Sequence, residues 1–349
     1  MRTLLVDGQW NLKRNFYHPS RKNLIGADGN LCGGTYGFLD SIKSIVNRTM
    51  PDRVIVMWDG FNAGKLRYRE FPFYKKSREK DFENEVRVIA TEGVGNPEDK
   101  EKFEMFRQKI EIQRYLEELF VRQVEEDYIE ADDLIAYYIL KKRPDEEVII
   151  FSRDKDFHQL ISEGVSVITP DSVEMITVHN FKDKKGYTHE NALLFKCFEG
   201  DPSDDITGVS GIGLKTLLEY YPDMANERYT YERMVDEGYA LNESRVSSKP
   251  KKKPLAKINK LVDDDTKRVL YRNAKLMNLR KPYINQPAID AVNEVRDRVL
   301  DTGRSIETAM EMFTKDGLAQ VAGLSNLNYF FAPFYSLQAK EKEFESSNQ

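Results

Sequence analysis

The chain has 349 residues, enough to bury a full core in one large domain or in two. Its 53 basic and 58 acidic residues give a net charge of −5, which alone argues against a nucleic-acid partner, although metal-bound carboxylates would inflate the acidic count. Cys32 and Cys197 form no CxxC pair, and no apolar run reaches the roughly 18 residues of a membrane helix. We therefore expect a soluble protein of the cytoplasm, without a disulfide framework, a secretory signal or a membrane partner.

Helix and strand signals alternate through the first two hundred residues. Residues 2–6 and 53–58 are short apolar runs that predict strands, and residues 33–48 between them predict a helix. The pattern then predicts, in chain order, a helix at 130–142, a strand at 147–152, a helix at 156–161 and a strand at 165–168. This order predicts an α/β fold with a mostly parallel sheet flanked by helices.

Beyond residue 186 the strand signals end and helices dominate. Residues 223–260 are polar and contain the lysine-rich run 247–254, which we interpret as a loop or insertion within a helical second half.

Acidic residues gather in three short clusters: Glu130-Ala-Asp132-Asp133, Asp154-Lys-Asp156 and Gly200-Asp201-Pro-Ser-Asp204-Asp205. Carboxylates this close repel one another unless hard cations such as Mg²⁺, which prefer oxygen ligands, hold them together. A single pair of such acids is about as often a helix cap or a solvated face.

The predicted elements aim these acids at one place. Asp7 and Asp59 follow the first two strands, and Asp154 follows a third, so all three should lie at the carboxyl edge of the sheet, where ligands bind. Glu130 and Asp133 stand three apart on one helical face, and Asp201 and Asp204 repeat that spacing. The convergence predicts a divalent-metal site.

Two hard metal ions about 3.5 to 4 Å apart can activate a water for attack on a phosphodiester and stabilise the leaving oxygen. The residues of other chemistries are missing, since the four histidines form no HExxH motif or close pair for zinc. The chain also has no GxSxG elbow and no GxxxxGK[ST] loop. Metal-dependent phosphodiester hydrolysis is therefore favoured.

These motifs together resemble the 5′ nuclease superfamily of flap endonucleases and 5′→3′ exonucleases, and within it most the ribonuclease H type of T4-like phages. The matching pieces are Leu4-Leu-Val-Asp7-Gly, Asp59, Arg69-Glu-Phe-Pro-Phe-Tyr74-Lys75-Lys-Ser-Arg78 and the three acidic clusters, in the family's order from residue 1 to about 220. The resemblance implies a PIN-like nuclease domain at 1–185 with a helical arch at about 62–100. It also implies a helical C-terminal domain at 186–349, with a helix-three-turn-helix at about 190–220 and a polar insertion at about 223–260.

The resemblance further implies the ligands and the cofactor. Two or more Mg²⁺ ions, for which Mn²⁺ can substitute, would be bound directly or through water by Asp7, Asp59, Glu130, Asp132, Asp133, Asp154, Asp156, Asp201 and Asp204.

The stretch 65–80 mixes cations with aromatic residues, which suits phosphate contacts beside base stacking, although a solvated charged helix is the commoner meaning of a basic run. The resemblance places an arch here, with Lys75 and Arg78 reaching the scissile phosphate as catalytic cations. It also implies that Arg14 binds phosphates of the 5′ strand. Tyr74 would stack on a base or, equally well, pack locally.

Glycines at 208, 211 and 213 precede a predicted helix and would let backbone amides approach a phosphate, although such spacing alone usually marks a tight turn. Behind the acidic cluster, the resemblance implies that Gly211, Gly213, Lys215 and Thr216 grip a duplex backbone without reading its sequence. It also implies a K⁺ ion held by carbonyls of the turn.

Three features stand outside the family pattern or remain open. Asp205 occupies a position where the family usually has Asn, which adds charge beside the metals. The lysines at 249–253 either extend a duplex contact or are solvated. The aromatic run 328–335 is either a docking motif or, more commonly, core.

We therefore expect a structure-specific 5′ nuclease acting on DNA and RNA–DNA duplexes with free 5′ ends or flaps during replication or repair. A single-strand-binding protein or sliding clamp is a possible partner, and the host cytoplasm is its place if a phage encodes it. The alternatives are a PIN-type single-strand ribonuclease and a non-catalytic, structure-specific DNA-binding protein.

Overall fold

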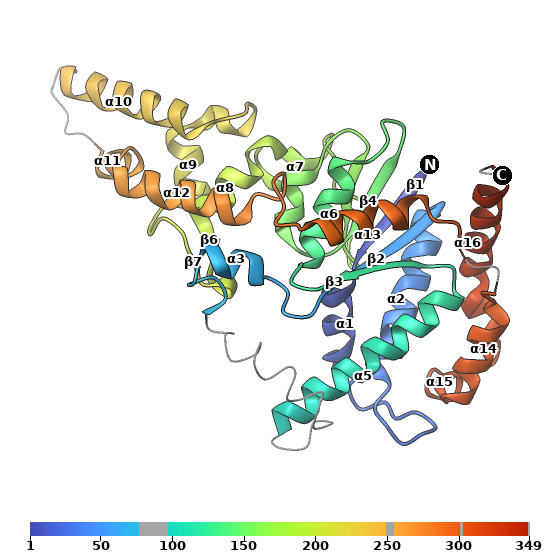
Figure 1. Cartoon of the computed structure of the whole chain (residues 1–349). Helices are drawn as coiled ribbons and strands as arrows, with labels where there is room; N and C mark the ends of the chain where they lie inside the picture. The colour runs from blue at the N-terminus through green and yellow to red at the C-terminus, as the bar shows by residue number, and fades with distance from the viewer. Residues whose placement is uncertain (77–96, 249–254, 301–302, 348–349) are drawn as a thin grey trace.

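A five-stranded, all-parallel sheet organises the computed structural model, which describes residues 1–76, 97–248, 255–300 and 303–347 (Figure 1). The strands are β1 (Arg2–Asp7), β2 (Arg53–Asp59), β3 (Arg122–Glu126), β4 (Glu147–Phe151) and β5 (Val165–Ile168). Their order is β3-β2-β1-β4-β5, so the chain builds outward from β1 in both directions. The strand order therefore reverses between β1 and β4, the point at which open parallel sheets form a ligand crevice at their carboxyl ends.

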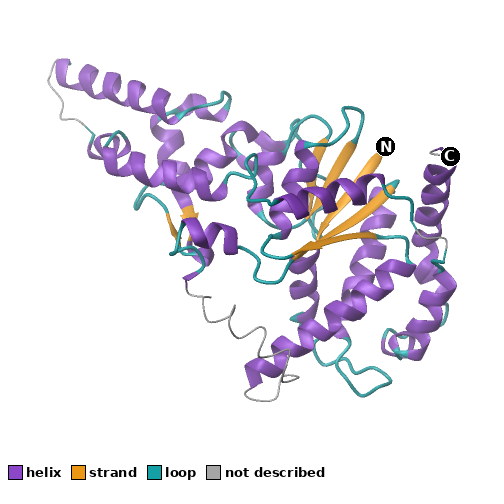
Figure 2. Cartoon of the chain, viewed as in Figure 1, coloured by secondary structure: helices purple, strands orange, loops and turns teal. Residues whose placement is uncertain are grey.

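Helices cover both faces of the sheet (Figure 2). One face packs Leu4 and Val6 against α1 (Gly8–Phe16), α2 (Gly33–Thr49), α5 (Pro97–Glu118), α14 (Ile306–Lys315), α15 (Leu318–Val321) and α16 (Leu327–Ser347). The other packs Leu5 and Ile150 against α6 (Ala131–Leu140), the 3-10 helix η2 (Lys155–Leu160) and α13 (Gln286–Asp297). Double coverage explains why β1, β2 and β4 are nearly continuous apolar runs.

A third core lies beyond the sheet and is mainly helical. It is formed by α8 (Ala192–Glu199), α9 (Leu214–Tyr220), η5 (Pro222–Ala225), α10 (Tyr231–Ser247), α11 (Ala256–Leu261) and α12 (Asp264–Met277), with the antiparallel pair β6 (Gly200–Asp201) and β7 (Ile206–Thr207). Three short helices lie between these elements and the sheet in sequence or within the segment: α7 (Phe181–Lys185), whose Phe181 packs into the core on the second face of the sheet, η3 (His189–Asn191) and η4 (Pro202–Asp204). After α3 (Lys65–Glu70), Tyr74 packs into this core. The start of the expected arch is thereby fastened to the helical part.

The predicted α/β class with a mostly parallel sheet is confirmed, and three details differ. Strand β3 was not predicted, because its sequence Arg-Gln-Val-Glu-Glu is polar, as suits an edge strand. Residues 155–160 form a 3-10 helix. The expectation that no strand follows residue 186 is wrong, because β6 and β7 form a short antiparallel pair there. Most of the expected arch lies outside the described residues.

The aromatic run near the C-terminus is core. Phe330, Phe331 and Phe334 are buried against α2 and α14, whereas Tyr329 is 81% exposed. Among the described residues, no helix combines the length and the apolar composition that crossing a bilayer requires.

A buried ion pair fastens α16 to the amino end of the sheet. Arg122 of β3 donates to Glu341 through Nε (3.0 Å) and Nη2 (2.5 Å), and both side chains are almost completely buried. Replacing Glu341 with Gln should lower the free energy of unfolding by about 3 kcal/mol, because it leaves a buried guanidinium without its counter-charge.

Urea unfolding measures this loss. The matched control is Glu343→Gln, whose carboxylate pairs with Lys340 at the surface and should change stability by less than about 0.5 kcal/mol. Equal losses in the two variants would contradict the fastening role of Glu341.

Candidate functional site

The carboxyl edge of the sheet holds Asp7 and Asp59 in fixed positions. Asp7 ends β1, accepts the Trp10 N–H at 3.0 Å as the N-cap of α1, and accepts the Ser152 hydroxyl at 3.0 Å. Asp59 ends β2 and accepts the Ala131 N–H at 2.9 Å, at the first turn of α6. Each carboxylate is therefore oriented by the start of a helix, which favours negative charge.

Asp132 and Asp154 join them. Burial, followed by the charges of Asp154 and Asp7, raises the pKa of Asp132 well above its ordinary value. Burial, opposed by the Trp10 hydrogen bond and reinforced by Asp59 and Asp154, raises the pKa of Asp7 to about 7. Carboxyl groups from β1, β2, α6 and the residue before η2 thus lie close enough to repel one another.

Glu130 and Asp133 are held by Arg67, a buried residue of α3. The guanidinium donates to Glu130 and, in a bidentate contact at 2.6 and 2.8 Å, to Asp133, while its Nε donates to the Leu276 carbonyl at 3.0 Å. Burial alone would raise the pKa of Glu130, but Lys75 and Arg67 lower it to about 2. Both oxygens of Asp133 are thereby engaged.

Nothing in the sequence pattern distinguished Arg67 from the other cations of the stretch 65–80. One feature of the sequence could have pointed to it. Glu130 and Asp133 lie on the inward face of a helix, and two buried carboxylates require a buried cation as partner.

Lys75 links the start of the expected arch to two acidic clusters. Its ammonium bonds to Glu130 and lies 3.9 Å from Asp204, and its backbone N–H donates to the Asp204 carbonyl at 3.0 Å. Lys75 has a φ of +51°, a left-handed conformation that costs a non-glycine residue about 1 kcal/mol or more and that concentrates at functional sites. Arg78 lies outside the described residues.

Tyr74 is 4% exposed, and its hydroxyl donates to Glu130 at 3.0 Å. This is the local packing that the sequence left open. The ring is buried in this conformation and offers no surface on which a base could stack.

Lys196 of α8 ties together the remaining acids. Its Nζ lies 2.7 Å from Asp156 and 2.7 Å from Asp201. Burial, followed by the charge of Asp154, raises the pKa of Asp156 to about 7 despite this lysine. Lys196 carried no sequence signal either.

These contacts decide how the acids fit a metal. Within the described ranges, no three His, Cys, Asp or Glu side chains lie close enough together to hold one ion. Lysines and an arginine form ion pairs with Glu130, Asp156 and Asp201. In those same ranges no ion pair joins Asp7, Asp132 or Asp154 to a cation. An all-oxygen set with uncompensated negative charge fits a hard divalent cation.

The stability of the metal-free protein should fall as the pH rises through the pKa values of these groups. Mainly because of burial, Asp7 and Asp156 have pKa values of about 7, above the value near 4 of an unfolded Asp. The folded state then binds more protons than the unfolded state, so stability present at acidic pH is lost between about pH 4 and pH 7. Urea unfolding in EDTA across this window measures the slope, and a rise in stability over it would contradict the assignment.

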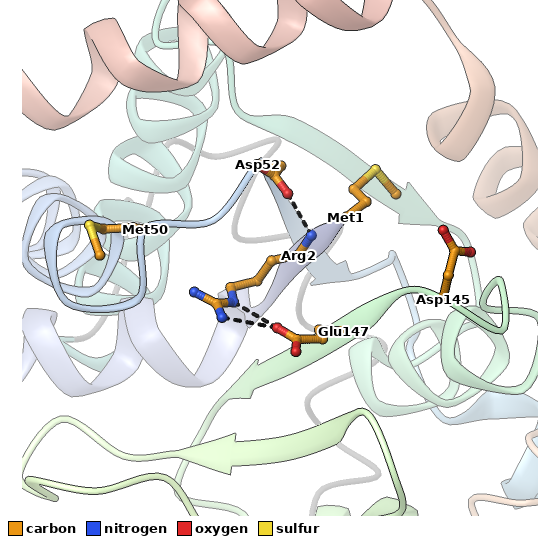
Figure 3. Close-up of a pocket in the computed structure, with 6 residues that line it drawn as sticks. All are labelled: Met1, Arg2, Met50, Asp52, Asp145 and Glu147. Carbon is orange, nitrogen blue, oxygen red and sulfur yellow. Dashed lines mark hydrogen bonds and ion pairs between the residues drawn. The ribbon is translucent and has the colours of Figure 1, made fainter.

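A separate pocket of about 300 Å³ lies at the opposite, amino edge of the sheet (Figure 3). Arg2 donates its backbone N–H to Asp52 at 2.7 Å and its Nε to Glu147 at 3.0 Å. Arg2 and Glu147 begin β1 and β4, so this pocket lies at the end of the sheet away from Asp7.

The residues expected to contact nucleic acid lie in different parts of the fold. Arg14 of α1 has a lowered pKa, because of burial and then the charges of Arg153 and Arg21. Gly211 has a φ of +76°, and the space a side chain would fill at Gly211 and Gly213 is open. Lys215 is exposed, whereas Thr216 is mostly buried. Asp205 has a φ of +59°, a conformation that Asn and Asp tolerate best among residues with a side chain. This explains why Asp can stand at a position where the family usually has Asn.

The sheet, its switch point and the acids around it define the class of protein: this is the fold of the 5′ nucleases. A bacteriophage T5 flap endonuclease, solved as a pseudo-enzyme-product complex with DNA and metal ions, is 19% identical and has a TM-score of 0.57 over 93% of this chain and 100% of that one. Human GEN1, solved with Holliday junction DNA, is 13% identical with a TM-score of 0.53 over 97% of this chain and 72% of that one. At these identities the likeness concerns the fold.

The chain belongs to the 5′-3′ exonuclease family. Residues 2–186 match the family model of the 5′-3′ exonuclease N-terminal, resolvase-like domain. The thermostable DNA polymerase I of Thermus filiformis is 33% identical over 218 residues, 62% of this chain, and the chain spans only 23% of that polymerase's length. A 5′-3′ exonuclease of Buchnera aphidicola subsp. Schizaphis graminum is 27% identical over 233 residues, 66% of this chain and 73% of its own. The narrower likeness to T4-like phages stays a prediction.

Proposed function

We propose that the protein is a Mg²⁺-dependent 5′ nuclease that hydrolyses phosphodiester bonds at 5′ ends and 5′ flaps of DNA and RNA–DNA duplexes. One observation carries the proposal: at the switch point of the sheet, Asp7, Asp132 and Asp154 lie close enough to raise the pKa of Asp7 and Asp132, and among the described residues none of the three has a cation partner. Residues 1–185 would form the nuclease domain and residues 186–349 the duplex-binding part. Removal of RNA primers in replication, or repair of flaps, would be its task in the cytoplasm.

The chain's own residues divide the work. Asp7, Asp59, Asp132 and Asp154 would hold divalent ions, with Mn²⁺ able to replace Mg²⁺, and these ions would supply an activated water and stabilise the leaving oxygen. Four further acids would bind the ions directly or through water: Asp156, Asp201, Asp204 and Glu130. Their ion pairs with Lys196 and Lys75 would have to break first. Asp133 would act mainly by positioning Arg67 and, through it, Glu130.

Lys75 would have a second partner in the reaction. Its ammonium bonds to Glu130 in the structure, and divalent ions bound by the acids would compensate that carboxylate. The ammonium would then be available to donate to the scissile phosphate as negative charge develops on it. Arg78 would assist. Neither residue supplies a nucleophile.

Replacing Lys75 with Ala should slow single-turnover cleavage by about 10²-fold while changing duplex affinity little, as expected for a donor that acts mainly in the transition state. The matched control is Lys76→Ala, the exposed neighbour, which should cleave at nearly the wild-type rate. Equal rates for the Lys75→Ala and wild-type proteins would overturn the catalytic role.

Duplex binding would fall to the turn between β7 and α9. Its open backbone at Gly211 and Gly213, with exposed Lys215 beside it, suits phosphates of a duplex read by shape. A K⁺ ion at this turn would have to share the Ser210 carbonyl with Lys260, which donates to it at 2.5 Å. Comparing duplex affinity in K⁺ and Na⁺ would test that part. A single-strand-binding protein or sliding clamp as partner rests on the resemblance alone.

Three substrates test the proposed function: a 5′-flap, a nicked RNA-primed duplex and a single strand, each with Mg²⁺ or with EDTA. We expect Mg²⁺-dependent cleavage of the first two, leaving 5′-phosphorylated products. Cleavage of single-stranded RNA alone would instead indicate a PIN-type ribonuclease. Binding without any cleavage would indicate a non-catalytic DNA-binding protein.

A further inference from the structure

The polar insertion brings a short helix against the glycine turn. Lys260 of α11 donates its ammonium to the Ser210 carbonyl at 2.5 Å, and Lys257 donates to the Thr216 hydroxyl at 3.4 Å. Both lysines are exposed, on the same rim of the turn as Lys215. The insertion, which lies far from the turn in sequence, therefore adds to its surface.

The orientation of α11 is fixed by its buried side. Ile258 and Leu261 are at most 1% exposed within the third core, and the Leu261 carbonyl accepts the Tyr231 hydroxyl of α10 at 3.0 Å. Asn242 of α10 also donates to Asn259 at 2.8 Å. With one side of the helix held by α10, Lys257 and Lys260 are left on the side that meets the turn.

The charges on this rim lack acidic partners. Among the described carboxylates, none forms an ion pair with Lys215, Lys257 or Lys260. Other cations of the same region are neutralised, since Arg233 pairs with Glu227 and Glu237. The rim therefore combines uncompensated ammonium groups with a turn whose backbone is bare at Gly211 and Gly213. This combination suits a chain of phosphates more than an isolated anion.

We infer that α11 is a second phosphate-binding element for the duplex, with Lys257 and Lys260 extending the contact made at the glycine turn. This inference rests on the proposed function, since it assigns part of the same substrate. The ligand is the phosphodiester backbone, bound without regard to base sequence, because ammonium groups at a rim contact phosphates and no base edge. The insertion would lengthen the stretch of duplex held behind the cleavage point.

The double variant Lys257→Ala/Lys260→Ala of the full chain tests the inference through binding of a fluorescent, nicked DNA duplex in EDTA, where no cleavage occurs. We expect affinity to fall about tenfold at low salt, and the slope of log affinity against log salt to become shallower by about 2, one unit per lost phosphate contact. Lys257→Arg/Lys260→Arg should bind like the wild type, since the charges remain.

The matched control is Lys315→Ala/Lys342→Ala, two exposed lysines on α14 and α16 at the other end of the molecule, which should leave affinity and slope unchanged (Figure 1). An unchanged salt slope in the Lys257→Ala/Lys260→Ala variant, with wild-type duplex binding intact, would overturn the inference and leave the proposed function standing. A fall in melting temperature with the slope unchanged would likewise overturn it, as a purely structural role. Absence of duplex binding by the wild type would refute the proposed function itself.

Discussion

Replacing Asp132 with Asn should stabilise the metal-free protein and nearly abolish cleavage, two opposite effects of one substitution. Burial and the charges of Asp154 and Asp7 make the ionised Asp132 unfavourable in the folded chain. A neutral amide of the same shape removes that repulsion, so we expect the free energy of unfolding to rise. The same change removes an oxygen ligand, so cleavage should fall by about 10³-fold or more.

Urea unfolding in EDTA and single-turnover cleavage of a 5′-flap with Mg²⁺ measure the two effects. Asp183→Asn on α7, an exposed position, is the control and should alter neither. A less stable Asp132→Asn protein that still cleaves would show that Asp132 serves the fold and does not bind metal.

Replacing Arg67 with Leu should impair both folding and catalysis. The guanidinium is buried and is the cation that joins Glu130 to Asp133, so its loss leaves two carboxylates poorly compensated in the interior. Removing one partner of such a pair costs about 3 to 5 kcal/mol. Cleavage should fall by about 10²-fold even where the variant remains folded, because Glu130 would lose its orientation.

Arg67→Lys separates charge from geometry. A lysine keeps the charge but cannot form the bidentate contact with Asp133, so stability should recover in part and the cleavage rate should recover less. Arg69→Leu, two positions along α3 and exposed, is the control. If Arg67→Leu cleaved like this control at a temperature where both are folded, Arg67 would be a structural residue only.

The acids that lie at strand ends were predictable from the sequence. Asp7, Asp59 and Asp154 follow apolar runs, and the rule that parallel strands present their carboxyl ends at one edge places them together without knowledge of the tertiary fold. Four strands of the sheet were predictable from their apolar runs. The edge strand β3 was not, because Gln123, Glu125 and Glu126 interrupt the apolar pattern that marks a strand.

The cations that organise these acids were not predictable. Arg67 and Lys196 sit among other basic residues in the sequence, and only the packing of α3 and α8 shows which side chain is turned inward. Tyr74 illustrates the same limit, because an aromatic residue in a basic stretch can stack on a base or enter a core. In the structure Tyr74 is buried in the third core, which is formed by segments far apart in the sequence.

Crystals grown with Mn²⁺ would test the central claim most directly, since the anomalous signal of the metal locates it without assumptions about activity. We predict at least one Mn²⁺ peak within about 2.5 Å of carboxylate oxygens of Asp7, Asp132 or Asp154, at the carboxyl edge of β1 and β4. Diffraction from a well-ordered active-site edge with no metal peak there, at millimolar Mn²⁺, would contradict the account.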